Sequence, residues 1–348
     1  MSTGLPAALV ALAAAAALAL PAAAQAPAPS KATPELIAAA KAEGKVSFYT
    51  SIEIKLAERL GKAFEAKYPG IKVQVERSGA ERNFQRIMQE YGSNIRNADV
   101  IESSDAAHVL VWKRNGWLAP FVPEDVAKWP ADQRDPDGTF AANRATLSVG
   151  GYNTKQLKPE EAPKSFADMV DAKWQGKIVK AHPGYSGTIM TATFQIAETL
   201  GWGYLEKLGK QKVMQVQSAT DPPKKLASGE RQVMADGVEY LMITMKKDGA
   251  PVEIIYPSEG TPLVAGMGAV LKAAPNPNAA RLFAIFLFSQ EGQQIACTEG
   301  GLRSFHPGVV EPGDRVPFAK IKTMKADPVA QEKAIEATKA KYTQYFGT

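Results

Sequence analysis

A strand, a polar turn and a helix follow one another near the start of the globular sequence, and this unit constrains the fold more than any other feature. Residues Lys45–Tyr49 alternate apolar and polar side chains and include β-branched and aromatic ones, which is typical of a strand. Thr50 and Ser51 follow at once, and apolar residues at helical spacing then occupy positions 56–64. Thr50 with Glu53 has the spacing of a capping box, so we expect a helix to begin here with its free N–H groups at the carboxyl end of the strand.

The same order of elements recurs along the chain. Further strands are predicted over Ile71–Glu76, Ala98–Ile101 and Lys177–Lys180. The polar turns that precede the following helices contain Ser78–Gly79, Ser103–Ser104 and Ser186–Gly187–Thr188. Ser78 with Glu81 repeats the capping-box spacing. Alternating strands and helices form parallel sheets whose carboxyl ends share one edge, so the sequence predicts an α/β fold in which these turns converge.

Length and composition narrow the class of protein. The chain has 348 residues, which is long for a single core and favours two lobes. The net charge of +5 is spread among interspersed acids and bases, without the basic stripe and stacking aromatics that nucleic-acid binding requires. We therefore expect no nucleic-acid partner. Cys297 is the single cysteine, so no internal disulfide can form.

The first residues are predicted to direct export. Leu5–Leu20 is an Ala/Leu run that ends at Pro21, and the small residues Ala22–Ala24 follow it. An apolar core of this length before small residues is typical of a signal peptide, here 1–24, although no Lys or Arg precedes it. Residues 25–33, rich in Ala and Pro, are expected to be a flexible leader. We therefore expect a periplasmic protein.

The turns provide candidate ligand-binding residues. Hydroxyl groups, backbone amides and one guanidinium at helix starts can hold an anion without catalytic chemistry. The candidates are Thr50, Ser51, Ser78, Gly79, Arg82, Ser103, Ser104, Ser186, Gly187 and Thr188, with Tyr240 covering the ligand from the second half. Any one of these hydroxyls is equally explained as an ordinary helix cap. Their repetition after successive strands is what favours a shared binding site.

Enzymatic motifs are not found in the sequence. The histidines His108, His182 and His306 are far apart, and neither G-x-S-x-G nor H-E-x-x-H occurs. We therefore expect no enzymatic activity. Two alternatives stay open: a periplasmic enzyme, which would need an acid–base pair such as His182 with Glu239, and a sensor subunit that presents a closed form to a receptor.

Several longer stretches together resemble a known family. They are FYTS…LGKAFEAKYPGIKV, ADVIESSDAAHVLVWKRNGWLAPF, GGYNTKQLKPEEAPKSFADMVDAKWQGKI, GAPVEIIYPSEGTPLV and NPNAARLFAIFLFSQEGQQ. The chain resembles the bacterial periplasmic solute-binding proteins of ABC importers, in particular the ferric-iron-binding type of extracellular solute-binding protein (family 1). The resemblance implies a type II fold with two parallel-sheet α/β lobes, closure on one ligand, and delivery to an inner-membrane permease served by a separate ATPase subunit.

The resemblance also implies a division of the chain. We expect a first lobe over 34–147 and 264–305, a second lobe over 148–263, and a C-terminal helical segment over 306–348 that packs on a lobe. The crossing hinge strands are expected near Ser148–Tyr152 and Leu263–Leu271. We expect the protein to be a monomer.

The chain departs from the ferric pattern in the residues that would bind the ligand. Ferric binders of this type use two adjacent tyrosines, whereas here Tyr240 lies between Glu239 and Leu241. Glu53, Glu239 and Tyr240 supply hard oxygen atoms, so they are the candidate ferric ligands. The predicted cleft is richer in hydroxyl and amide donors than in anionic ligands. We therefore predict a small anionic solute (a phosphonate, phosphate ester, carboxylate or anion-chelated metal), with ferric iron as the alternative and no resident cofactor.

Overall fold

The computed structural model describes residue 1 and residues 26–347. The predicted signal peptide, 1–24, lies outside the described residues apart from Met1. Within the described part of the chain, no helix combines the length and apolar character needed to cross a membrane.

One sheet has six strands in the order β11-β10-β3-β1-β2, with β4 paired to β10. Its strands are β1 (Lys45–Thr50), β2 (Lys72–Arg77), β3 (Val100–Ser103), β4 (Ala141–Leu147), β10 (Thr261–Val270) and β11 (Thr323–Met324). The helices of this lobe are α1 (Pro34–Glu43), α2 (Ile54–Lys67), α3 (Ala80–Gly92), α4 (Ala106–Arg114), α9 (Pro277–Phe288) and α10 (Gln290–Thr298). β1 runs parallel to β2 and β3 because helical crossovers join them. Phe48, Phe64 and Phe283 pack edge to face in the core beneath α9.

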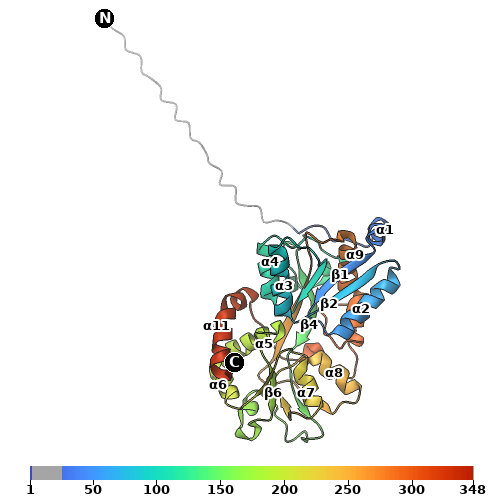
Figure 1. Ribbon diagram of the computed structural model, residues 1–348. Coiled ribbons are helices and arrows are strands. Elements are labelled where there is room, and N and C mark those ends of the chain that lie inside the picture. The colour runs from blue at the N-terminus through green and yellow to red at the C-terminus, as the bar shows by residue number, and fades with distance from the viewer. Residues whose placement is uncertain (2–25, 348) are drawn as a thin grey trace.

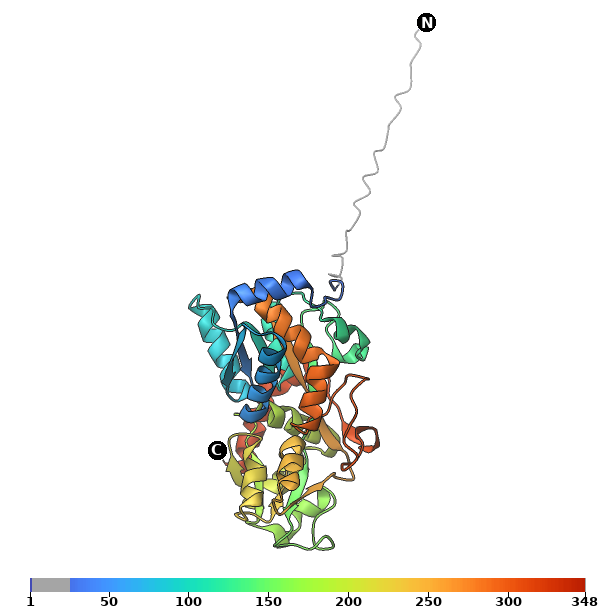
Figure 2. The same ribbon diagram turned by 90° about the vertical axis from the view of Figure 1, so that its right-hand side faces the viewer.

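The other sheet has five strands in the order β7-β6-β8-β5-β9. Its strands are β5 (Gly150–Asn153), β6 (Ile178–Ala181), β7 (Met214–Val216), β8 (Val233–Met234) and β9 (Val252–Ile255). Its helices are α5 (Gly187–Leu200), α6 (Trp202–Gly209), α7 (Asp221–Ala227) and α8 (Glu239–Lys247). Short 3-10 helices span Glu124–Lys128, Ala131–Gln133, Ala167–Val170, Ala172–Trp174 and Phe318–Lys320. Figures 1 and 2 show the two sheets in separate bodies, one above the other.

The two lobes are joined by strands that pass from one sheet to the other. β4 continues through Ser148 and Val149 into β5, and β9 returns through residues 256–260 to β10. Leu263–Leu271, expected to cross between the lobes, instead belongs almost entirely to β10 of the first sheet. β10 is antiparallel to β3 and β4, and β5 is antiparallel to β8 and β9. The sheets are therefore mixed rather than purely parallel, because the crossing strands enter each sheet against the direction of their neighbours.

The C-terminal helix α11 (Pro328–Phe346) contacts both lobes. It packs against α4 of the first lobe and against α5 and α6 of the second. Figure 1 shows it on one flank of the molecule, extending from the level of α4 towards α6. Before this helix, residues 306–327 contain only a 3-10 helix and the short strand β11.

Both predicted capping boxes are wrong. Helix α2 is capped by Glu53 itself, whose Oε2 accepts from the N–H groups of Lys55 (2.8 Å) and Leu56 (3.3 Å). The Thr50 hydroxyl instead donates to buried Glu102 at 2.9 Å. Helix α3 begins after Gly79 without a side-chain cap, and the Ser78 N–H donates to the Thr50 carbonyl at 3.1 Å rather than to the Glu81 carboxylate. The Thr50 hydroxyl lies before the helix, where it donates to the charged carboxylate and accepts from the Ile52 N–H at 3.1 Å, which accounts for the first difference.

Candidate functional site

A small polar cavity lies where the lobes meet. It measures about 20 Å³, room for about one water molecule, so the lobes are closed on each other. Its walls from the first lobe are Ser51, Arg77, Gly79, Ala80, Ser104 and Arg144. Its walls from the second lobe are Tyr185, Ser186, Thr188, Ser218, Ala219, Thr220, Val238 and Tyr240. Hydroxyl groups and guanidinium groups dominate this lining.

Four helices begin at the cavity wall. The N-cap residues of α3, α5, α7 and α8 all line the cavity: Gly79, Ser186, Thr220 and Val238. The first N–H groups of a helix lack intrahelical partners and carry the positive end of the helix dipole. Helix starts from both lobes therefore give the cavity a positive potential that favours an anion.

Arg77 is the uncompensated charge of the cavity. It ends β2, and its guanidinium donates to the Ile52 carbonyl (3.3 Å) and, across the lobes, to the Ser218 hydroxyl (3.4 Å). No carboxylate pairs with it in the part of the chain that the structure describes. A guanidinium held by two long neutral bonds keeps most of its capacity to bind an incoming carboxylate or phosphate.

Arg144 is neutralised by a buried partner. It forms an ion pair with Glu102 through Nε (3.0 Å) and a terminal nitrogen (2.9 Å), and it also donates to Thr146 and Ser51. The second oxygen of Glu102 accepts from Thr50 and Ser51. This network fixes the floor of the cavity and leaves Arg77 as its net positive charge.

Tyr240 presents a phenol to the cavity. Its side chain is buried, and its hydroxyl has no hydrogen-bond partner among the described residues. Burial raises the pKa of Tyr240, while the guanidinium groups of Arg144 and Arg77 act in the opposite direction. The neutral phenol can thus donate a hydrogen bond to an oxygen atom of a ligand.

The structure brings together about half of the predicted binding residues. Those that line the cavity are Ser51, Gly79, Ser104, Ser186, Thr188 and Tyr240. Those that do not line it are Thr50, Ser78, Arg82, Ser103 and Gly187. Thr50 is bonded to Glu102, Arg82 donates to Gln217 of the other lobe at 2.7 Å, and Ser103 is bonded to His108 at 2.9 Å. These groups support the walls or the contact between lobes.

Two glycines allow the lobes to approach closely. A Cβ atom on Gly79 would lie 2.9 Å from the Tyr185 carbonyl oxygen, and one on Gly187 would lie 2.8 Å from the Cβ of Asp105. Any larger residue would hold the lobes apart at these points. Gly187 therefore contributes to closure rather than to the cavity wall.

The candidate ferric ligands are not grouped. Glu53 and Tyr240 line a wider groove of about 500 Å³ between α2 and α8. Glu239 does not: Arg303 holds its carboxylate with bonds of 3.0 and 2.7 Å, and Tyr256 donates to it at 2.5 Å. Within the described chain, no three His, Cys, Asp or Glu residues are grouped to hold a metal ion. Because Glu239 is occupied, it is equally unavailable as the acid–base partner of His182.

Arg77, Arg144, Ser218 and Thr220 are cavity residues that the sequence interpretation missed. Arg77 had a usable signal, because it lies directly between the predicted strand Ile71–Glu76 and the Ser78–Gly79 turn. Arg144 and Ser218 had none: the first comes from the crossing strand β4 and the second from a loop of the other lobe.

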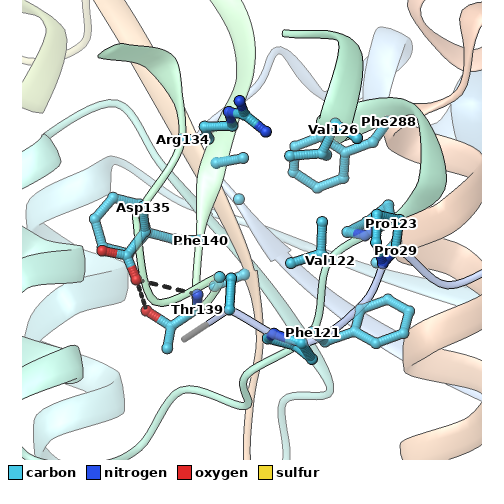
Figure 3. A pocket seen from close by; sticks show the side chains of 18 of the residues that line it. Pro29, Phe121, Val122, Pro123, Val126, Arg134, Asp135, Thr139, Phe140 and Phe288 are labelled. Atoms are coloured by element: carbon cyan, nitrogen blue, oxygen red, sulfur yellow. Dashed lines mark hydrogen bonds between the residues drawn. The ribbon is translucent and has the colours of Figure 1, made fainter. Parts of the chain in front are cut away.

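A larger cavity of different character lies elsewhere in the described chain. It measures about 590 Å³ and lies on the first lobe, between the 121–141 segment, α9 and residues 26–29. Figure 3 shows Phe121, Val122, Val126 and Phe288 around it, with Asp135 bonded to Thr139. Its lining is mostly apolar, with Arg134, Asp135 and Thr139 as its polar side chains, and none of the described α-helices has its N-cap residue there.

Behind the cavity, His108 and Glu81 form a pair that makes stability sensitive to acid. The hydrogen bond from His108 lowers the pKa of Glu81 to about 2. A depressed pKa contributes stability above the ordinary value of 4.5, and this contribution is lost as the pH falls towards 2. We expect the urea concentration at the unfolding midpoint to depend less steeply on pH in Glu81→Gln than in the original protein, between pH 4.5 and pH 2. The same change at exposed Glu58 is the control, and an equally steep acid dependence in Glu81→Gln would contradict the assignment.

Comparisons with known proteins agree with this geometry. The family of bacterial extracellular solute-binding proteins matches residues 96–325. An uncharacterised protein of Haemophilus influenzae is 28% identical over 75% of this chain and 78% of its own length. The "Probable ABC transporter periplasmic-binding protein y4fP" of Sinorhizobium fredii is 22% identical over 64% of this chain and 63% of its own.

Two solved structures share the fold. AfuA from Actinobacillus pleuropneumoniae, a periplasmic binding protein solved with fructose-6-phosphate, superposes with a TM-score of 0.79 at 25% identity, covering 87% of this chain and 98% of AfuA. Iron-bound HitA from Pseudomonas aeruginosa gives 0.75 at 22% identity, covering 87% and 99%. The predicted two-lobed, type II α/β fold is thereby confirmed, as is the family resemblance. The chain belongs to the bacterial extracellular solute-binding proteins.

Proposed function

We propose that the protein captures a small anionic solute between its lobes and delivers it to an inner-membrane permease. The observation that carries the proposal is Arg77, a guanidinium without a carboxylate partner in the described chain, at a cavity where four helices begin. Such a site suits a phosphate ester, phosphonate, carboxylate or anion-chelated metal. The likeness to AfuA, solved with a sugar phosphate, supports the phosphorylated members of this class.

Ferric iron is the second candidate. Glu53 and Tyr240 line the same groove, and both HitA and the iron uptake protein A2 of Synechocystis are similar to this chain. A tyrosinate–iron complex absorbs visible light, so ferric loading would colour the protein. Glu239, the third candidate ferric ligand, is held by Arg303 and Tyr256, which disfavours this candidate.

We propose three further features for this protein. The protein acts as a monomer, forms a complex with the permease, whose ATPase subunit is separate, and catalyses no reaction. Binding free energy comes from closure, which surrounds the solute with donors from both lobes.

A thermal-shift panel tests the proposal. Fructose 6-phosphate, inorganic phosphate, an alkylphosphonate, citrate and ferric citrate are the probes, and uncharged fructose is the matched control. A probe at 100 times its Kd stabilises the folded protein by about 2.7 kcal/mol. We expect a shift with at least one anion and none with fructose. Stabilisation by neutral solutes alone, or a coloured protein stabilised by free ferric iron alone, would overturn the anion assignment.

Tyr240→Phe separates binding from stability. Its hydroxyl has no partner in the closed protein, so we expect the melting temperature without solute to stay unchanged. Affinity for the stabilising anion should fall by about tenfold, the value of one hydrogen bond to a charged acceptor. Tyr256→Phe is the matched control, because it removes a hydrogen bond to Glu239 outside the cavity and should lower stability without changing affinity. Calorimetric titration measures both, and unchanged affinity in Tyr240→Phe would exclude the phenol from the site.

A further inference from the structure

We propose that Gln331 of α11 holds the two lobes in the closed form, and so sets solute affinity without touching the solute. Gln331 is 2% exposed, and its single amide nitrogen donates to Asp105 Oδ1 and to Thr191 Oγ1, each at 2.9 Å. Asp105 belongs to the first lobe and Thr191 to the second. One side-chain amide therefore bridges both lobes.

The residues that Gln331 joins lie directly behind the cavity wall. Asp105 is the N-cap of α4 and follows Ser104, which lines the cavity. Thr191 is on α5, whose first residues Ser186 and Thr188 line the opposite wall. Separation of the lobes moves Asp105 away from Thr191, so the amide cannot keep both acceptors. Opening therefore costs at least one buried hydrogen bond, and the bond to the carboxylate is the stronger of the two.

Helix α11 is fixed to the second lobe by its other end. The Tyr342 hydroxyl donates to Gln215 of β7 at 3.0 Å. Gly209 of α6 packs so closely against the Tyr345 carbonyl that a Cβ atom would not fit between them. Towards its start, Glu332 pairs with Arg114 of α4 in an exposed ion pair. The helix thus moves with the second lobe, and its first turns reach across to the first lobe (Figure 1).

We call Gln331, with its bonds to Asp105 and Thr191, the latch. The latch affects binding by changing the fraction of molecules that are closed. When only a fraction of molecules is closed, the apparent Kd rises by the inverse of that fraction. Loss of one to two buried hydrogen bonds shifts such an equilibrium by about tenfold. A variant lacking the latch is thus expected to open more readily and to bind more weakly, although every cavity residue is intact.

The test uses Gln331→Met, which keeps the length of the side chain and removes its donor. Gln344→Met, on the exposed side of the same helix, is the matched control. Spin labels on cysteines replacing Glu58 of α2 and Lys247 of α8, both exposed, report the distance between lobes, and native Cys297 is buried. We expect the solute-free Gln331→Met protein to show a larger population of long distances than either the original protein or Gln344→Met. Thr191→Val, which removes one acceptor, should give an intermediate shift and provides the test if Gln331→Met does not fold.

The measurement of solute affinity rests on the proposed function, whereas the measurement of spin-label distances does not. With fructose 6-phosphate or inorganic phosphate as the probe, Gln331→Met should weaken binding by the same factor as the loss in closed fraction, up to about tenfold. If neither probe binds even the original protein, the proposed function fails while the distances still decide the latch. Unchanged distances in both Gln331→Met and Thr191→Val, or an equal change in Gln344→Met, would overturn the latch.

Discussion

Arg77→Gln is expected to weaken binding of the anionic probe by about 100-fold, which corresponds to about 2.7 kcal/mol. The guanidinium is the cavity's uncompensated charge, and its neutral bonds to the Ile52 carbonyl and the Ser218 hydroxyl do not satisfy it. Glutamine keeps a donor of similar reach but removes the charge. Stability without solute should change little, since the positive charge has no carboxylate partner in the described chain. Calorimetric titration with fructose 6-phosphate and with inorganic phosphate measures the effect.

Arg82→Gln is the matched control for this experiment. Arg82 also belongs to the first lobe and also bonds to the second, through Gln217, but it is exposed and does not line the cavity. We expect only a small loss of affinity, from the weakened contact between lobes. Equal losses in the two variants would mean that the arginines act through closure or long-range attraction and that Arg77 does not contact the solute.

Glu102→Ala is expected to lower the free energy of unfolding by about 3–5 kcal/mol, because it leaves the Arg144 guanidinium buried without its counter-ion. The Arg144 side chain is 3% exposed and that of Glu102 is fully buried. The change also removes the acceptor for Thr50 and Ser51 at the end of β1. Urea unfolding followed by fluorescence measures the loss, with lobe-specific probes to detect separate transitions.

Two further variants make this second prediction specific. Glu76→Ala removes a carboxylate from an exposed ion pair with Arg86 and should cost less than about 1 kcal/mol. The double variant Glu102→Leu with Arg144→Met replaces both charges by apolar groups and should recover part of the lost stability. A double variant no more stable than Glu102→Ala would show that the hydrogen bonds to Thr50 and Ser51, rather than the unpaired charge, dominate the cost.

The sequence predicted those cavity residues that act through local geometry. A strand that ends in Ser, Thr or Gly and opens a helix places backbone donors at the strand end, and this depends only on neighbours in the chain. Gly79, Ser104 and Ser186 were identified in this way, and the structure places all three at the cavity. Thr50 was misassigned because local spacing does not reveal an acceptor far along the chain, here Glu102.

Glu239 was misassigned for the same kind of reason. Beside Tyr240 it looks like a metal ligand, yet successive helical residues point in different directions, and the carboxylate meets Arg303 on the other side of α8. Tyr240 faces the cavity and Glu239 faces the ion pair. Whether a carboxylate is free for a ligand depends on the residues that packing brings to it.

The sequence alone determined the α/β class and the order of strands, polar turns and helices, because periodicity and turn chemistry are properties of neighbouring residues. The tertiary structure alone decided which charges are neutralised: Arg144 is cancelled by Glu102, Arg77 is not, and Gln331 connects two lobes from the far end of the chain. The physical reason is that Coulomb energies and buried hydrogen bonds depend on separation in space, and strands that cross between lobes bring together residues that lie far apart in sequence.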